Sequence, residues 1–419
     1  MATLGHEVIG VDTDKAKIDA LAAGDAPFYE PGLPELLEEA FATGRLRFSS
    51  EIADVQGAEV HFICVGTPQL HGEIAADLTY VDSAVDALLP HLSAGDLVVG
   101  KSTVPVGTAE RLAAILAEAD TGALLAWNPE FLREGHAVKD TLHPDRLVYG
   151  VPAGIDGDRA VALLDEIYAT SIAEGSPRLV TDLATAQLVK VAANSFLATK
   201  ISFINAMAEL CEATGADVTL LADAIGHDER IGRKFLNAGL GFGGGCLPKD
   251  IRAFMARAGE LGADQTLAFL HEVDAINNRR RIRMVDIARD ECGGSIEGLR
   301  VAVLGASFKP NSDDVRDSPA LDVAEQLRLQ GADVVVTDPQ AIDNAKAVHP
   351  ELSYADSAFE AATGADLVLL LTEWAEYVDL DPASLGDVVR QRRIMDGRLA
   401  LDPGTWRDAG WVYRSLGRP

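Results

Sequence analysis

A glycine-rich turn that ends in a cysteine is the segment best suited to chemistry. It reads Gly241-Phe-Gly-Gly-Gly-Cys246-Leu-Pro-Lys249-Asp250. Glycines let a backbone approach a ligand closely, and the proline predicts the first turn of a helix that continues through residues 250–258. A thiol at a helix N-terminus beside Lys249 is stabilised as thiolate, the nucleophilic form. Cys246 is therefore a candidate nucleophile, whereas Cys64, Cys211 and Cys292 fit small buried side chains.

Three further polar residues share one stripe of a long predicted helix. Lys190 and Asn194 are four residues apart, and Leu197, Ile201 and Asn205 continue the same stripe. Polar groups on a stripe that includes Leu and Ile either point into a site or form an amphipathic edge with the lysine exposed. The pattern alone leaves both interpretations open.

Polar residues also follow predicted strands, where open α/β sheets bind their ligands. Asn128-Pro-Glu130-Phe-Leu-Arg-Glu134-Gly135 brings two carboxylates to one strand end, and Ser102-Thr103 brings two hydroxyls to another. Asp12 ends the first predicted strand of this chain and suits the acid at the tip of the second strand of a dinucleotide fold, which binds the adenosine ribose and favours NAD. The alternative for Asp12 is a loop acid that caps the next helix.

Two phosphate-binding patterns match by spacing and fail by context. The segment from Gly95 to Ser102 fits the P-loop pattern, but its middle residues are strand-like and Pro105 follows. Gly239 to Gly244 fits GxGxxG, yet no strand precedes it. The nine histidines form no recognisable ligand set, so no metal site is predicted.

The elements that would position these residues alternate between apolar strands and amphipathic helices. This alternation predicts an α/β protein with parallel sheets. The expected early strands are Glu7–Asp12, Val60–Val65, Asp96–Val99 and Leu124–Trp127, and the helices are Lys15–Ala23, Pro34–Thr43, Val81–Leu92 and Ala109–Ala119. A helix from Leu183 to about Thr214 runs without Pro or Gly, and a second α/β region follows, with Arg300–Leu304, Asp333–Asp338 and Asp366–Thr372 as strands and Pro319–Gln330 as a helix.

Composition narrows the class of protein. The 419 residues carry 36 Lys and Arg against 65 Asp and Glu, a formal charge of −29 that repels nucleic acid and anionic lipid. The sequence has no apolar run of membrane-span length and no signal-peptide layout, and its four cysteines lie far apart. A cytoplasmic protein that meets an anionic ligand with a local cluster of cations is expected.

Seven segments, in this order, resemble the UDP-glucose 6-dehydrogenase family. They are VGTP (65–68), KSTVPVGT (101–108), NPEFLREG (128–135), AANSFLATKISFIN (192–205), RIGRKFLNAGLGFGGGCLPKD (230–250), FKPNSDDVRDSP (308–319) and TEW (372–374). The resemblance implies two Rossmann-like domains joined by a long central helix. It also implies oxidation of the C6 alcohol of UDP-glucose to a carboxylate with two NAD and one cysteine.

The resemblance assigns roles to the candidate residues. Cys246 would capture the aldehyde as a thiohemiacetal that is oxidised to a thioester, with Lys190 and Asp250 holding the water or base of the first step. Lys190 and Asn194 would stabilise the oxyanion, and Glu130 with Thr103 would hold the hydrolytic water. The implied NAD contacts are Asp12, Lys17, Thr67, Thr103, Glu134, Lys249 and Arg316. The implied UDP-sugar contacts are Phe131, Leu132, Arg133, Glu134, Lys190, Asn194, Arg230 of a neighbouring subunit, Asn237, Ala238, Gly239, Leu240, Gly241, Phe242, Gly243, Lys309 and Arg398.

The resemblance also predicts the domain organisation. We expect an NAD-binding domain at 1–180, a helical dimerisation region with the catalytic cysteine at 181–290, and a UDP-sugar-binding domain at 296–419. The long helix would form the core of a homodimer.

Two departures from the family pattern keep alternatives open. Gly245 stands where the family usually has Ser. More importantly, the family's first strand, its GxGxxG loop and most of the next helix are missing before Glu7, so the backbone amides that cradle the NAD pyrophosphate are not seen. The chain is therefore an active dehydrogenase whose true start lies upstream, or an inactive truncated homologue that dimerises and binds UDP-sugar. A third possibility is a dehydrogenase of GDP-mannose or of a UDP-N-acetylhexosamine.

Overall fold

The computed structural model describes residues 1–418 and divides into two compact units. The N-terminal unit comprises Met1–Ala193 and Arg252–Asp264, and the C-terminal unit comprises Asn194–Ile251 and the chain from Gln265 onward. The helix α8 (Leu183–Thr214) begins in the first unit and continues into the second. Its bounds are those predicted from the run without Pro or Gly.

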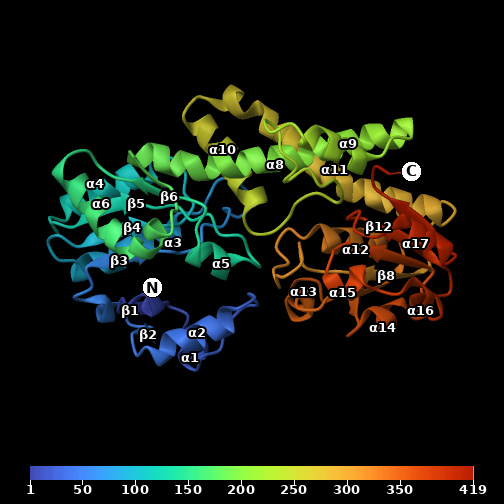
Figure 1. The fold of residues 1–419 in the computed structure, drawn as a ribbon, viewed down its shortest axis with the longest axis horizontal. Helices are drawn as coiled ribbons and strands as arrows, with labels where there is room; N and C mark the ends of the chain where they lie inside the picture. The colour runs from blue at the N-terminus through green and yellow to red at the C-terminus, as the bar shows by residue number, and fades with distance from the viewer. Residues whose placement is uncertain (419) are drawn as a thin grey trace. The chain divides into compact units, whose positions relative to one another are not determined.

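Parallel strands with helices on both faces form the N-terminal unit (Figure 1). One sheet contains, in spatial order, β3 (Val60–Ile63), β4 (Leu97–Gly100), β5 (Leu124–Trp127), β6 (Leu147–Gly150) and β7 (Arg178–Thr181). Only β5 and β6 are antiparallel, through the single pair Trp127 and Gly150. The helices are α1 (Lys15–Ala22), α2 (Leu33–Ala42), α3 (Thr79–Leu88), α4 (Thr108–Glu118), α5 (Ala137–Leu142), α6 (Ile155–Ile167) and α7 (Ala169–Ala173).

Strand β4 illustrates why its sequence is apolar throughout. Val98 packs into a core with residues of α3 and α4, whereas Leu97 and Val99 pack into a second core with residues of α6. A strand that is covered on both faces has no solvent-facing position. Since β4 lies within the segment from Gly95 to Ser102, the rejection of that segment as a phosphate loop is confirmed.

The strand that ends before Asp12 belongs to a separate small sheet. β1 (Val8–Val11) pairs in parallel with β2 (Leu46–Ser49). Among residues 1–418, β1 has no other strand partner and β3 pairs only with β4. β1 and β3 therefore lie in two separate sheets of this unit.

A six-stranded parallel sheet forms most of the C-terminal unit. Its order is β10-β9-β8-β11-β12-β13, which is the 3-2-1-4-5-6 order of a doubly wound dinucleotide fold. The strands are β8 (Arg300–Leu304), β9 (Asp333–Thr337), β10 (Ser353–Tyr354), β11 (Leu367–Leu370), β12 (Arg393–Asp396) and β13 (Val412–Ser415). The fold class predicted from the alternation of strands and helices is thus confirmed for two parallel α/β regions.

The remaining helices include three that frame the cysteine turn. They are α9 (Val218–Gly226), α10 (Leu247–Glu260) and α11 (Ala268–Glu291). Around the C-terminal sheet lie α12 (Pro319–Leu329), α13 (Ile342–Val348), α14 (Ala358–Ala362), α15 (Ala375–Val378), α16 (Pro382–Gly386) and α17 (Pro403–Asp408), coloured orange to red in Figure 1. In residues 1–418 no helix combines the length and apolarity that crossing a bilayer requires.

Candidate active site

Cys246 lies immediately before α10, as predicted, and its side chain is exposed. The preceding glycines form a loop between α9 and α10 rather than a strand-loop-helix unit, which confirms the rejection of GxGxxG at Gly239 to Gly244. Of the other cysteines, Cys211 is buried and Cys292 is half-buried. Cys64 is exposed, so the prediction that it is a buried structural cysteine is wrong. It follows β3 directly and lies at a strand end.

A buried asparagine of α11 holds the glycine loop. Asn277 accepts a hydrogen bond from the amide of Phe242 at 2.7 Å and donates one to its carbonyl at 2.9 Å. At Gly241 the backbone is left-handed, with φ at +89°, and a Cβ there would lie 2.2 Å from Asn277 Oδ1. Only glycine fits this close approach. The sequence pattern gave no signal for Asn277, because it is 35 residues away from the loop.

Further contacts fix the start of the same loop. Asn205 of α8 is fully buried, and its Oδ1 accepts the amide of Gly239 at 2.9 Å. The Gly239 carbonyl accepts a bond from Arg280 Nε at 3.2 Å. Leu240 is buried, and its amide donates to the carbonyl of Gly397 at 3.0 Å. At Asn205 the polar stripe of the long helix therefore points into the protein, and the interpretation as an exposed amphipathic edge does not hold at this position.

The carboxylate of Asp250 is buried one turn into α10 and is held from two sides. Asn194 Nδ2 donates to Asp250 Oδ2 at 2.6 Å, and Lys249 Nζ lies 2.5 Å from Asp250 Oδ1. Asp250 is 2% exposed. Asn194 and Asp250 are thus brought together as a rigid polar pair, and Lys249 is bound beside the carboxylate.

In the N-terminal unit, Lys190 forms an ion pair with Glu130. Lys190 Nζ lies 2.9 Å from Glu130 Oε1, and the lysine side chain is 6% exposed. Its ammonium also lies 5.7 Å from the centre of the Phe131 ring. The other oxygen of Glu130 accepts the amide of Leu132 at 2.6 Å. Three predicted site residues, Lys190, Glu130 and Phe131, therefore meet at the end of β5.

The loop after β5 is anchored at its first residue by groups that the sequence analysis missed. Asn128 Oδ1 accepts hydrogen bonds from Lys101 Nζ at 2.9 Å and from the Tyr168 hydroxyl at 2.7 Å. Burial lowers the pKa of Lys101. An ammonium in so apolar a place needs good acceptors, and Asn128 and Tyr168 supply them.

Arg133, in the middle of this loop, is bound by α5. Its Nε and Nη2 atoms donate to Asp140 at 2.8 and 2.5 Å. The hydrogen bonds from Arg133 hold the pKa of Asp140 below its ordinary value. Leu132 is exposed, and Phe131 stacks against Arg146, whose guanidinium carbon lies 3.8 Å from the ring centre.

Predicted cofactor contacts lie at three strand ends. Asp12 follows β1, and its Oδ2 lies 2.7 Å from Lys17 Nζ. The side chain of Asp12 is 36% exposed and that of Lys17 is 42% exposed. Thr67, after β3, donates from its hydroxyl to the carbonyl of Thr103 at 2.7 Å. The loops after β3 and β4 are thereby tied together.

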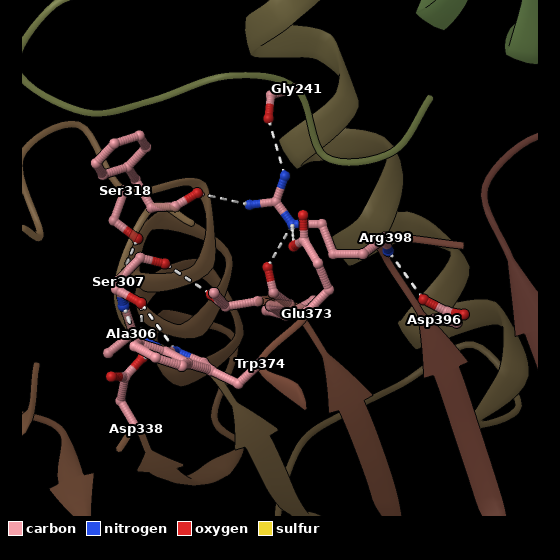
Figure 2. Close-up of polar contacts among 12 residues, drawn as sticks. Gly241, Ala306, Ser307, Ser318, Asp338, Glu373, Trp374, Asp396 and Arg398 are labelled. Atoms are coloured by element: carbon pink, nitrogen blue, oxygen red, sulfur yellow. Dashed lines mark hydrogen bonds and ion pairs between the residues drawn. The ribbon is translucent and has the colours of Figure 1, made fainter. Parts of the chain in front are cut away.

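In the C-terminal unit, Arg398 clamps three backbone segments (Figure 2). It donates to the carbonyls of Leu371 at 2.7 Å, Gly241 at 3.1 Å and Phe308 at 3.1 Å. Glu373 lies 3.3 Å from its Nε and balances the charge. Arg398 therefore joins the glycine loop to the segment that carries Lys309.

The same segment, after β8, is fixed by Asp338, at the end of β9 (Figure 2). Asp338 Oδ2 accepts the amides of Ala306 and Ser307 at 2.8 and 2.9 Å and the indole nitrogen of Trp374 at 3.1 Å. In a dinucleotide fold an acid at this position binds a ribose. Here Asp338 is 6% exposed, and its Oδ2 already accepts hydrogen bonds from the protein's own amide and indole groups.

Two predicted contacts are exposed arginines paired with nearby acids. Arg230 binds Asp228, with 2.6 Å between Nη2 and Oδ2, and its side chain is 87% exposed. Arg316 binds Asp314 at 2.7 Å and is 67% exposed. A Cβ at Gly245 would lie 2.2 Å from the guanidinium carbon of Arg316, so glycine at this position leaves room for the arginine beside the loop that precedes Cys246. Asn237 is exposed and accepts a bond from Arg233 at 2.8 Å.

Comparison with known proteins finds three domain models, all of one family. Residues 1–172 match the NAD binding domain of the UDP-glucose/GDP-mannose dehydrogenase family, residues 184–279 its central domain and residues 302–403 its UDP binding domain.

Similar proteins extend over the whole chain. A UDP-glucose 6-dehydrogenase of Rhizobium meliloti is 41% identical, covering 100% of this chain and 95% of its own length, and TuaD of Bacillus subtilis, of the same name, is 40% identical over 100% and 89%. A solved UDP-glucose dehydrogenase from Pyrobaculum islandicum is 37% identical with a TM-score of 0.90, covering 100% of this chain and 94% of its own. A UDP-D-ManNAc dehydrogenase from Pyrococcus horikoshii is 26% identical with a TM-score of 0.85 over 100% and 95%.

Proposed function

Because the chain belongs to the UDP-glucose/GDP-mannose dehydrogenase family across all three of its domains, we propose that it oxidises UDP-glucose to UDP-glucuronate with NAD. The observation that carries this proposal is the exposed Cys246 at the start of α10, with the buried Asp250 one turn further on and fixed by Asn194. A nucleophile and a fixed carboxylate on one helix end suit covalent oxidation of an alcohol.

The strand ends of the N-terminal unit fit the polar groups of NAD. Asp12 presents a partly exposed carboxylate that can accept hydrogen bonds from a ribose diol. Thr67 and Thr103 bring hydroxyls to the ends of β3 and β4. When bound, NAD supplies the hydride acceptor for each of the two oxidations. The other assigned contacts are Lys17, Glu134, Lys249 and Arg316.

In the first oxidation we assign to Asp250 and Lys190 the holding of the water or base that removes the C6 hydroxyl proton. The alcohol loses this proton and a hydride and becomes an aldehyde. Asn194 and Lys190 stabilise the negative charge that develops on oxygen. The two bonds that Asn194 and Lys249 make to Asp250 keep its carboxylate oriented for this step.

Cys246 then binds the C6 aldehyde carbon covalently while that carbon is oxidised to the level of a carboxylic acid. Its sulfur bonds to the aldehyde carbon and the carbonyl oxygen takes a proton, which gives a thiohemiacetal. Loss of that proton and of a second hydride leaves a thioester. Glu130, with Thr103, activates a water that attacks the thioester, and the carbon–sulfur bond breaks to release the carboxylate and the thiol.

The UDP-sugar is assigned to the loop after β5, the glycine loop and the C-terminal domain. Lys309 and Arg398 bring cationic side chains to this region of a chain whose formal charge is −29, and Glu373 pairs with Arg398. Arg398 already donates to three carbonyls, so its main contribution is to fix the loop around Gly241.

A homodimer through α8 is supported by an exposed apolar stripe. Phe196, Phe203 and Leu210 recur every seven residues and are 66%, 49% and 58% exposed. Large apolar side chains grouped on one helix face usually meet a partner surface. In this dimer Arg230 would reach the neighbouring subunit's UDP-sugar. Light scattering after size exclusion tests the assembly.

Two other functions remain supported by specific observations. Similarity to the Pyrococcus horikoshii UDP-D-ManNAc dehydrogenase supports a UDP-N-acetylhexosamine or, within the same family, GDP-mannose as substrate. Because β1 and β3 lie in separate sheets, we also consider a chain that dimerises and binds UDP-sugar without turnover.

One set of assays separates the three functions. NADH formation is measured with UDP-glucose, UDP-N-acetylmannosamine and GDP-mannose at equal concentrations, and melting temperatures are measured with NAD and with UDP-glucose. Fastest turnover of UDP-glucose supports the proposal, and fastest turnover of another sugar rejects it. Stabilisation by UDP-glucose alone, without turnover, supports the binding protein.

A further inference from the structure

A buried carboxylate distant in sequence holds the end of the loop that follows β5. Glu30 lies in the turn between α1 and α2 and is 6% exposed. Its Oε2 accepts the amide of Gly135 at 2.7 Å, and its Oε1 accepts the amide of Ala137 at 2.7 Å. Each carboxylate oxygen thus satisfies one backbone donor, and 105 residues separate Glu30 from Gly135.

The two amides can meet one carboxylate because of the local backbone. Gly135 is left-handed with φ at +75°, and the amide of His136 turns away to the carbonyl of Arg133 at 2.8 Å. α5 begins at Ala137, and His136 makes no side-chain cap. Glu30 therefore supplies from outside the acceptor that a capping residue would normally provide.

The other end of the loop is held independently, by the bonds of Lys101 and Tyr168 to Asn128. Between these two anchors lie Glu130 and Phe131–Glu134. A short loop fixed at both ends presents its side chains with little freedom, whereas release of one end lets them move away from a productive geometry.

We propose that Glu30 is a positioning residue of the sugar-oxidising site: by binding the amides of Gly135 and Ala137 it fixes the loop that carries Glu130 and the sugar contacts. This inference rests on the proposed function. Glu30 also belongs to the segment that follows β1 and Asp12, so it joins the assigned ribose-binding element to the assigned sugar-binding loop.

The test compares Glu30→Gln with a control, Glu38→Gln, on the exposed face of α2. An amide keeps one acceptor oxygen but turns an NH2 group toward the second backbone donor, so one buried amide loses its partner. Glu30→Asp keeps the charge but is too short to reach both donors, and it carries the test if the glutamine variant does not fold.

Steady-state kinetics supply the first readout. We expect the KM for UDP-glucose to rise about tenfold, the effect of one lost buried hydrogen bond, while the KM for NAD changes less than about twofold. A purely structural role would lower the amount of active enzyme and leave both KM values as they were. Equal kinetics in the Glu30→Gln variant and the wild type would overturn the proposal.

Amide hydrogen exchange of residues 131–137 supplies a readout that needs no turnover. We expect faster exchange there in Glu30→Gln than in Glu38→Gln, with unchanged exchange in β8. Unchanged exchange in residues 131–137 would contradict the anchor. A wild-type chain that is inert toward UDP-glucose would refute the proposed function, while the exchange result would still decide whether Glu30 holds the loop.

Discussion

Asn194 donates its side-chain amide to Asp250, with 2.6 Å between Nδ2 and Oδ2, across 56 residues of sequence. The bond links α8 to the first turn of α10, the helix that begins after Cys246. Asp250 is buried, so this bond and the contact with Lys249 fix the orientation of its carboxylate. A fixed carboxylate can hold a proton acceptor in one place during the first oxidation.

Replacing Asn194 with Ala should therefore lower both the free energy of unfolding and the rate of the first oxidation. The buried Asp250 Oδ2 loses a donor, which should cost about 1–3 kcal/mol of unfolding free energy. Urea denaturation measures this, with Asn344→Ala as a control, because the Asn344 bond to the Asp313 carbonyl is exposed. Loss of equal size in both variants would argue against the Asp250 contact.

Glu130→Gln should separate oxidation from hydrolysis. The amide cannot act as a general base, so kcat should fall about 10²- to 10⁴-fold while the early steps continue. A rapid-mixing experiment should then give a burst of NADH followed by a slow phase, with the sugar still bonded to Cys246. Glu118→Gln, on the exposed end of α4, is the control. Full kcat in Glu130→Gln would remove Glu130 from the hydrolytic step.

Arg398→Lys tests the clamp in the C-terminal unit. A lysine ammonium keeps the charge but cannot reach the three carbonyls that the planar guanidinium reaches. We expect unfolding free energy to fall by about 1–3 kcal/mol and binding of UDP-glucose to weaken. Calorimetry measures both, with Arg414→Lys as the exposed control. Wild-type affinity in Arg398→Lys would mean that charge alone is needed.

The Arg133–Asp140 pair predicts a pH dependence of stability. The bonds from Arg133 lower the pKa of Asp140 in the folded protein, so the unfolded chain binds more protons in the acidic range. The stabilisation is present above the ordinary pKa of 3.8 and is lost as the pH falls through the folded value.

Thermal denaturation of wild type and Asp140→Asn at several pH values measures this contribution. The wild type should melt at the higher temperature near neutral pH, and the difference should shrink as the pH falls below the ordinary pKa of 3.8 and through the lower pKa of the folded protein. A difference that stays constant over this range would show that ionisation of Asp140 does not matter.

Local signals in the sequence were sufficient for the elements that carry the site. The run without Pro or Gly predicted α8 with its observed bounds, and apolar runs predicted β5 and β8 in the same way. The turn at Gly241–Cys246 followed from glycine and proline chemistry. Helical spacing placed Asn205 on the same stripe as Lys190 and Asn194, but only the structure shows that Asn205 points inward.

Groups that act at long range could not be predicted in this way. Asn277, Glu30 and Lys101 hold site loops that are 35, 105 and 27 residues away. No period or local motif links such pairs, because the fold alone brings them together. Helix α11 was also missed: its run of arginines resembles a solvated surface, yet Arg280 is fully buried and pairs with Glu212 at 3.2 Å.

The most direct test of the central claim is the number of NADH formed per UDP-glucose consumed when the sugar is limiting. Capture of the aldehyde by Cys246 predicts two NADH per sugar, with no free aldehyde in solution and no carboxylate product from Cys246→Ala. One NADH per sugar, or carboxylate formation by Cys246→Ala at the wild-type rate, would contradict oxidation through Cys246.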